Sequence, residues 1–513
     1  MTRMLFLFGV ATIPFTGIAG WTSLGELAPM LSTYFLLPAV LVAVPAMAAD
    51  AVFGPTPSAA RRTSWRLPTA ILLIACAIVV ASSVVNAGEI VTNVFQGRHA
   101  LEKFASSFVV ILYGFCLSYF VYFVVGRDWR RWLLKPIAVS ALLCIAFSAF
   151  EILYRRFGLM SGAFELVDSV VHSGAHAALF DKGWDTRIRS LAFEPPDFGN
   201  YVGYVWPWLL CGWLFTAGAA KYRYGALWTL LTALALYSGA RTGLVMITVG
   251  AIVFLALRFV YLPLAPRRTS GLLKGLVTIL LLWVGLLSVV AAAFGFSTYE
   301  QSVIGGSSVS DLSRLVSIKA ALGMFLDRPL LGFGLGQFGF FFAEYMPPWG
   351  YLSHEVNDWL TSPPKFWPAS YSIYARLAGE LGLVGLVSWI TLWLWLATSI
   401  VAATRKFQRL TGRTPAVSYA LVVSCFCVLS SGLGTDTLRS PMIWITLGLS
   451  CRYLFELSNA EERKGAVGGL RNLITARSTM CAHGHALPGA ERAGPAGFGI
   501  LRLRRGRLGS TGP

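Results

Sequence analysis

The sequence has few charged residues. Asp, Glu, Lys and Arg make up 13% of its 513 residues, whereas a soluble globular domain carries about 25%. So few charges could not cover the surface of a water-soluble protein of this size, and that class is therefore excluded. Instead, 56% of the residues are hydrophobic and the mean hydropathy is +0.65. Part of the surface must face lipid.

Acidic residues are scarcer than basic ones, at 24 against 42, and the formal net charge is +18. Such an excess can indicate a nucleic-acid-binding protein. Here, however, the basic residues lie in short loops between apolar runs and in the C-terminal tail. This distribution is the positive-inside pattern of membrane topology. It favours a membrane protein over one that binds nucleic acid.

Cysteines outside apolar runs are almost absent. Seven of the eight lie within apolar runs, and the eighth, Cys481, lies in the tail. No predicted external loop contains one, so we expect no disulfide framework and no metal-ligand spacing. Residues 4–20 are apolar but open the first span, so we also expect no cleaved signal peptide.

Apolar runs of about 20 residues, enough to cross a hydrocarbon core of about 30 Å, recur along the chain. We predict an all-α polytopic integral membrane protein with about twelve transmembrane helices. The spans are expected near 4–20, 27–49, 67–86, 105–126, 134–154, 200–218, 225–238, 242–261, 275–296, 380–403, 415–433 and 441–457. With both termini in the cytoplasm, every inner loop is basic.

Residues 1–457 are thus predicted to form one membrane domain. The basic tail over 458–513 lacks hydrophobic periodicity, and we expect it to be disordered and cytoplasmic. Two large extracytoplasmic loops, about 155–199 and 297–379, exceed the roughly 15 residues of ordinary connections, which indicates a function. Within the second loop, residues 311–326 have the spacing of an amphipathic helix.

Arginines on the predicted outer side are the first candidates for chemistry. Arg241 lies in YSGARTGLV, in a tight turn between two short apolar runs. An arginine near hydrocarbon is costly unless it is solvated or paired. Arg241 therefore either extends to the lipid headgroups or belongs to a functional site.

The segment RIRSLAFEPPDFGNYVGY leads directly into the sixth span and contains Arg187, Arg189 and Glu194. The two prolines after Glu194 fix the direction of the chain as it reaches the membrane. Glu194 is thereby expected at the membrane face, near the arginines. Its role is either a structural ion pair or a site carboxylate.

Arg314 and His354 are candidates in the second outer loop. Arg314 follows Asp311 by three residues, so these residues form either a surface ion pair, worth roughly 0–1 kcal/mol, or part of a site. His354 is a candidate general base, although a lone loop histidine is more often structural. His172 and His176 share a helical spacing but have no third ligand in view. DRPLLGFGLGQF lacks the Lys-Ser/Thr of a nucleotide-binding loop and is expected to form a close backbone turn.

Four segments occur in the order of a known family. They are RIRSLAFEPPDFGNY, YSGARTGLV, SRLVSIKAALGMFLDRPLLGFGLGQF and YSIYARLAGELGLVGLVSWI. Together, over about residues 180–400, they resemble the O-antigen ligase and polysaccharide polymerase superfamily of bacterial inner-membrane proteins. These proteins use polyprenyl-diphosphate-linked glycans. The resemblance implies a glycosyltransferase that acts at the outer face of the cytoplasmic membrane.

The resemblance also implies roles for the candidate residues. A leaving diphosphate is stabilised by guanidinium groups, which match phosphate oxygens and stay charged near lipid. We assign diphosphate binding to Arg189, Arg241, Arg314 and, in reserve, Arg187. We assign the general base to Glu194 or His354. No metal or other cofactor is expected; the expected partners are the lipid-linked glycan, an acceptor glycan, membrane lipid and a chain-length regulator.

One departure from the family pattern bears on the reaction. Ligases typically have a His-Asn pair shortly before the Glu-Leu-Gly segment, and here Tyr371 and Ser372 stand at that point. This favours polymerisation of repeat units into O-antigen, capsule or exopolysaccharide over ligation of polymer to lipid A core. A lipid-linked oligosaccharide flippase is the second alternative. It would show related halves and charged sites near the midplane, and neither is evident.

Overall fold

The computed structural model describes residues 1–53, 66–125, 129–174, 187–262, 309–361 and 367–459. These residues are almost entirely helical, as predicted. Within the described ranges the strands are Val94–Phe95 and Arg98–His99, which pair antiparallel in a short hairpin. The predicted span at 275–296 and nearly all of the predicted tail lie outside the described residues.

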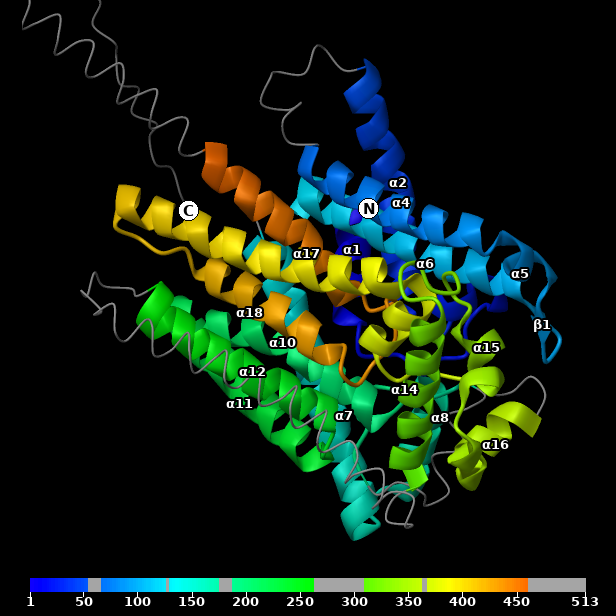
Figure 1. Cartoon of the computed structure of the whole chain (residues 1–513). Coiled ribbons are helices and arrows are strands. Elements are labelled where there is room, and N and C mark those ends of the chain that lie inside the picture. Colours follow the sequence, from blue (N-terminus) through cyan, green and yellow to red (C-terminus); the bar gives the residue numbers. More distant parts are fainter. Residues whose placement is uncertain (54–65, 126–128, 175–186, 263–308, 362–366, 460–513) are drawn as a thin grey trace, which may run out of the picture. The chain divides into compact units, whose positions relative to one another are not determined.

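The first half of the chain forms a series of helices (Figure 1). They are α1 (Thr2–Ala11), α2 (Leu31–Phe53), α4 (Arg66–Val85), α5 (Ala87–Thr92), α6 (Ala100–Phe120), α7 (Lys135–Phe157) and α8 (Ser161–Val171). A 3₁₀ turn, η1 (Thr22–Leu27), precedes α2, and the π turns η2 (Val121–Val125) and η4 (Arg130–Leu134) lie between α6 and α7.

The second half continues in the same way. It contains α10 (Pro195–Phe215), α11 (Ala219–Ser238), α12 (Arg241–Ala256), α14 (Val309–Asp327), α15 (Phe338–Tyr345), α16 (His354–Thr361), α17 (Ile373–Thr411) and α18 (Ala416–Ser431). The π turn η5 (Leu257–Tyr261) extends α12, the 3₁₀ turn η6 (Pro348–Leu352) precedes α16, and a last helix covers 441–459.

Five helices of the described residues are long and apolar enough to cross a membrane. They cover Arg66–Val85, Ala100–Val125, Trp132–Phe157, Arg241–Tyr261 and Ile373–Thr411. They coincide with the predicted spans near 67–86, 105–126, 134–154, 242–261 and 380–403. Three shorter apolar helices, Thr2–Ala11, Leu31–Ala43 and Ala416–Ser431, coincide with further predicted spans. The multi-pass membrane class is confirmed, while the total of about twelve spans stays a prediction.

Helix α10 lies at the centre of the bundle and packs against α11, α12 and α18 (Figure 1). Small residues allow its close approach to α12. A Cβ added at Gly199 would lie 2.6 Å from Cβ of Ala240, and one added at Gly243 would lie 2.6 Å from Cα of Gly199. Small residues at such contacts let helix backbones approach, as is common between membrane helices. The position of α10 therefore depends on these glycines.

Helix α17 is interrupted at Gly382, whose φ of 64° and ψ of −159° are not helical. At this kink the backbone of α17 forms hydrogen bonds with the backbone of the segment 329–334. The backbone N–H groups of Phe333 and Gly334 donate to the carbonyls of Gly379 and Glu380 at 3.0 and 2.8 Å, and that of Leu383 donates to Pro329 at 2.7 Å. The predicted turn of DRPLLGFGLGQF is therefore a backbone junction between the outer loop and a membrane helix.

Beyond this junction, the second outer loop has a hydrophobic core of its own. The amphipathic helix predicted at 311–326 is α14, and its buried face packs with α15 and α16. Val316, Phe342, Val356 and Trp359 belong to this core, and each is 3% exposed or less. The described part of the loop is thus an ordered cap over the helix ends that are predicted to face outward.

Segments predicted to lie on the outer side contact one another. Lys103, before the span near 105–126, pairs with Glu26, and Asp436, between the last two spans, accepts from the N–H of Ser370 in the second outer loop. Residues far apart in the sequence thus meet at the same end of the bundle. The alternation of inner and outer connections stays a prediction.

Candidate functional site

A first polar cluster forms where α10, α14 and α16 meet the segment before α17. Glu194 is the N-cap residue of α10, with Pro195 at the first helical position. Glu355, in the first turn of α16, accepts hydrogen bonds from the hydroxyls of Ser313, at 2.5 Å, and Tyr371. Arg314 stacks on the ring of Tyr371, with 5.3 Å from its guanidinium carbon to the ring centroid. We call Glu194, Arg314, Glu355 and Tyr371 the carboxylate cluster.

The charges of this cluster act on Glu194. Burial raises the pKa of Glu194 to about 7, with repulsion from Asp197 and Glu355 acting in the same direction and the positive charges of Arg314 and Arg439 opposing it. A carboxyl group with a pKa near neutrality can accept a proton at physiological pH and then release it. Burial and the Glu355 carboxylate raise the pKa of the Tyr371 phenol, which keeps it protonated as a hydrogen-bond donor.

Arg314 has capacity for further hydrogen bonds. Its Nε is buried and has no partner among the described residues. A guanidinium carries five N–H donors, and a buried donor without a partner costs free energy. The group is thus suited to an anionic oxygen from a ligand.

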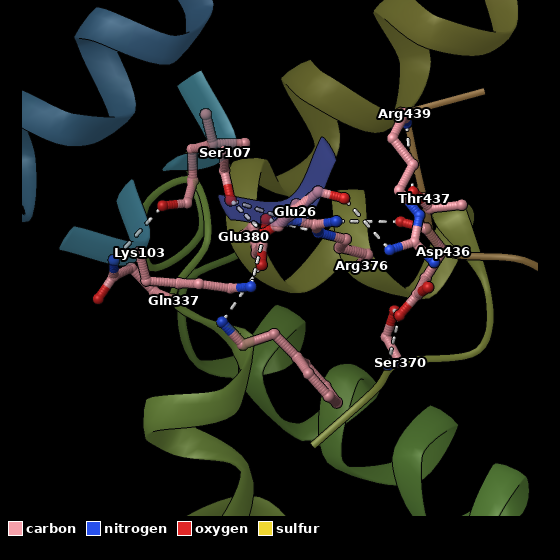
Figure 2. Close-up of polar contacts among 12 residues, drawn as sticks. Glu26, Lys103, Ser107, Gln337, Ser370, Arg376, Glu380, Asp436, Thr437 and Arg439 are labelled. Carbon is pink, nitrogen blue, oxygen red and sulfur yellow. Dashed lines mark hydrogen bonds and ion pairs between the residues drawn. The ribbon is translucent and has the colours of Figure 1, made fainter. Parts of the chain in front are cut away.

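A second cluster surrounds a polar cavity of about 170 Å³ at the N-terminal ends of α6 and α17 (Figure 2). Its lining contains three cationic and three anionic side chains: Lys103, Arg376 and Arg439, and Glu26, Glu380 and Asp436. Lys103 lies 2.5 Å from Glu26, and Nε of Arg376 lies 3.1 Å from Glu380, one turn along α17. We call this space the polar cavity.

Residues 329–334, which we call the glycine segment, and the kink of α17 place Glu380 at this cavity. Glu380 is 2% exposed, and its Oε1 accepts from the backbone N–H of Phe338 at 3.3 Å. Gly332 makes the approach possible, because a Cβ added there would lie 2.5 Å from the carbonyl carbon of Glu380. Burial raises the pKa of the Glu26 carboxyl, but the charges of Lys103, Arg376 and Arg439 outweigh it and lower that pKa to about 2. Glu26 is therefore ionised and holds Lys103 and Arg376 in place.

Arg439 connects the two clusters. It lines the polar cavity and also a small cavity of about 50 Å³ that contains Asp197 and Asn200 of α10. Its charge acts on Glu194 in the carboxylate cluster and on Glu26 in the polar cavity. The two clusters are parts of one charged region at one end of the bundle.

An apolar cavity of about 550 Å³ adjoins this region. Its lining comes from α4, α6, α17 and residues 438–447. Leu377, Leu381 and Leu438 line it, while their chain neighbours Arg376, Glu380 and Arg439 line the polar cavity. The structure thus places an apolar space beside a charged one, which is the arrangement that an amphipathic ligand requires.

The structure separates the six residues predicted for the site. Glu194 and Arg314 share the carboxylate cluster. His354 is exposed at the first position of α16, beside Glu355. Arg241 is exposed at the start of α12, and Arg187 is exposed near the preceding turn, where a Cβ on Gly239 would lie 3.8 Å from its Cδ.

Arg189 lies in a different environment. It is 2% exposed, and its guanidinium donates to Asp168 at 2.8 Å. Asp168 also contacts Nδ1 of His172 at 2.7 Å, and the other ring nitrogen of His172 contacts the carbonyl of Ala192 at 2.9 Å. These contacts fix the first outer loop to the start of α10. Among the residues that the structure describes, no group of three or more His, Cys, Asp or Glu side chains is arranged to hold a metal ion.

The sequence interpretation missed Glu26, Lys103, Asp436 and Arg439 entirely. Arg376 and Glu380 were present in the fourth family-like segment but received no role. One signal could have identified them: each is a charged residue at the predicted outer end of an apolar run, where an unpaired charge is costly. Their partners, however, lie too far away in the sequence for local spacing to reveal them.

Comparison with known proteins supports the resemblance. Residues 225–390 match the family model described as O-antigen ligase. The matched range contains most of α11, all of α12 and α14–α16, and the first half of α17. It therefore includes Arg241, Arg314, Glu355, Tyr371, Arg376 and Glu380. No curated protein matches the chain. The family match supports a function of O-antigen ligase or polymerase type and gives no support to a flippase.

Proposed function

We propose that this chain, whose residues 225–390 match the O-antigen ligase family model, polymerises lipid-linked oligosaccharide repeat units. The substrates are glycans on a polyprenyl diphosphate, and the product is a surface polysaccharide such as O-antigen, capsule or exopolysaccharide. The observation that carries the proposal is the apolar cavity beside the charged region. A polyprenyl chain fits an apolar space, and a diphosphate and glycan require a polar one.

In this proposal, glycosyl transfer takes place at the carboxylate cluster. The acceptor hydroxyl loses its proton to Glu194 as its oxygen bonds to the anomeric carbon of the donor sugar. The bond from that carbon to the diphosphate oxygen breaks, and the diphosphate leaves with the electron pair. Arg314 stabilises the negative charge that develops on the leaving group, because preorganised cations act most strongly where charge appears in the transition state.

His354 remains the alternative base. It is exposed at the start of α16, whereas Glu194 is partly buried and lies in the field of two arginines. Glu355 has a supporting role, because its two oxygens accept from the hydroxyls of Ser313 and Tyr371, and Arg314 stacks on the Tyr371 ring. We propose Glu194 as the base on these grounds. Arg241 and Arg187 are exposed, and their proposed role is contact with the glycan or the lipid headgroup.

Polymerase is favoured over ligase by the residue at the position of the ligase histidine. Tyr371 stands there, and its phenol donates to Glu355 and stacks under Arg314. A phenol whose pKa is raised by burial is a poor base at neutral pH. The acceptor in the polymerase reaction is a second lipid-linked glycan, and a chain-length regulator is a natural partner. Ligation to lipid A core is the alternative reaction. The proposed location is the outer face of the bacterial cytoplasmic membrane, with both termini in the cytoplasm.

The test separates the two reactions. The full chain, purified in lipid nanodiscs, is supplied with a polyprenyl-diphosphate-linked repeat unit, and the products are resolved by size. A ladder of glycans still on the lipid carrier is expected for a polymerase. Transfer that occurs only when lipid A core is added, without a ladder, would identify a ligase. In a deletion strain, loss of long chains with single repeat units on core would agree with the first outcome.

A further inference from the structure

The polar cavity does not offer its three cations equally to a ligand. Lys103 is neutralised by Glu26 at 2.5 Å, and Arg376 is neutralised by Glu380 at 3.1 Å. Arg376 also donates to the backbone carbonyl of Asp436 at 3.1 Å. Both side chains are therefore occupied in holding the walls of the cavity.

Arg439 differs from these two cations. Its guanidinium donates one hydrogen bond, at 3.4 Å, to the backbone carbonyl of Glu26. Among the carboxylates that the structure describes, none forms an ion pair with it. It is half-buried and lines both polar spaces, so most of its N–H donors remain available to a ligand.

The position of Arg439 matches the junction of an amphipathic substrate. Leu438 lines the apolar cavity, and Arg439, the next residue, lines the polar cavity. A polyprenyl diphosphate changes from hydrocarbon to anion at a single bond. Leu438 and Arg439 are consecutive residues, so the chain provides an apolar contact and a cationic contact at adjacent positions. Arg439 lies outside residues 225–390, so the family match does not assign it a role.

We propose that Arg439 binds the diphosphate of the lipid-linked substrate. This inference rests on the proposed function. The guanidinium presents two N–H donors to two phosphate oxygens and keeps its charge beside lipid. The polyprenyl chain then extends along Leu438 into the apolar cavity. The charges of Lys103 and Arg376 remain with their carboxylates, which leaves the polar cavity for the uncharged part of the glycan.

Binding to the purified full chain in nanodiscs tests the proposal. The probes are a long-chain polyprenyl diphosphate and the corresponding monophosphate, and the measurement is the dissociation constant of each. Arg439→Gln is expected to weaken diphosphate binding by about tenfold to hundredfold, the range for a charged hydrogen bond. Arg439→Lys should lose less, because lysine retains the charge but not the two-pronged geometry. Monophosphate binding should change less than diphosphate binding in both variants.

Arg452→Gln is the matched control. Arg452 lies in the helix at 441–459 and pairs with Glu456 at 2.8 Å, away from the cavities. Its replacement should leave both dissociation constants unchanged. A protection experiment on the unaltered protein avoids any folding defect of the variants. Labelling of Arg439 by an arginine-selective dicarbonyl, followed by mass spectrometry, should be slowed by polyprenyl diphosphate and not by the monophosphate.

The outcomes separate this inference from the proposed function. If the unaltered protein binds no polyprenyl diphosphate, the proposed function itself is wrong. If it binds the diphosphate, but Arg439→Gln binds equally tightly or Arg439 is labelled at the same rate, only the assignment of Arg439 is wrong. Weaker binding by Arg439→Gln together with protection of Arg439 supports both.

Discussion

The ionisation of Glu194 gives the sharpest prediction. Four charged groups act on this carboxyl group from the elements around it: Asp197 of α10, Glu355 of α16, Arg314 of α14 and Arg439 of the segment before the last helix. Burial raises its pKa to about 7. A general base works only when deprotonated, so the transfer rate should rise with pH through about 7 and fall below it.

The magnitude follows from the fraction that is ionised. With a pKa of about 7, roughly nine-tenths of Glu194 is deprotonated at pH 8 and roughly one-tenth at pH 6. The rate should therefore fall about tenfold between pH 8 and pH 6. Glu194→Gln should lower the rate about 10²- to 10⁴-fold, the usual contribution of a general base. The remaining rate should no longer depend on pH near 7. Arg314→Gln removes a charge that lowers this pKa, so the midpoint of the surviving activity should move upward.

The assay is glycan extension in nanodiscs at saturating donor, from pH 5.5 to 8.5. Glu344→Gln is the control, because Glu344 is an exposed carboxylate of α15 in the same outer cap. It should keep both the rate and the profile of the unaltered protein. The reasoning is refuted if Glu194→Gln retains the full rate with an unchanged profile. A loss of activity in Glu194→Gln without any pH dependence in the unaltered protein would indicate a positioning role instead.

Three further predictions concern the frame and the lipid. Gly382→Ala should destabilise the chain by about 1–3 kcal/mol in thermal unfolding, because φ of Gly382 is 64° and the new Cβ would lie 2.4 Å from the carbonyl carbon of Leu330. Gly88→Ala is the control and should not destabilise the chain, because the space around Gly88 is open. Arg189→Gln should cost about 3–5 kcal/mol, and combining it with Asp168→Asn should cost less than the sum of the two changes, since each single change breaks the same buried ion pair. Ala75→Trp, in the apolar cavity, should raise KM about tenfold for long-chain donors and little for short-chain ones.

The helices could be predicted because their signal is local. An apolar run long enough to cross a bilayer has few alternatives to a helix, since lipid offers no partners for backbone N–H and C=O groups. The runs near 67–86, 105–126 and 380–403 accordingly correspond to α4, α6 and α17. The kink at Gly382 is not a local feature. It depends on hydrogen bonds to residues 329–334, which the sequence alone does not pair with α17.

The site could be predicted only where a charge stood out against an apolar background. Arg314 and Glu194 were identified in that way, and the structure brings them together. Lys103 pairs with Glu26 across 77 residues, and Arg439 reaches Glu26 across 413. No spacing rule connects residues at such separations. Asp168, the partner of Arg189, lies 21 residues away, so the buried contact of Arg189 could not be foreseen either.

The junction between the glycine segment and α17 has a consequence for how such proteins diversify. The outer cap is attached to the membrane helix through main-chain groups at 329–334 and 379–383, and these bonds do not depend on which side chains the cap displays. Replacements at cap surface positions beyond Gly336 can therefore accumulate without moving Glu380 or the polar cavity. Grafting the cap surface from a relative with a different glycan, while keeping both anchor segments, should transfer sugar preference and leave the catalytic frame intact.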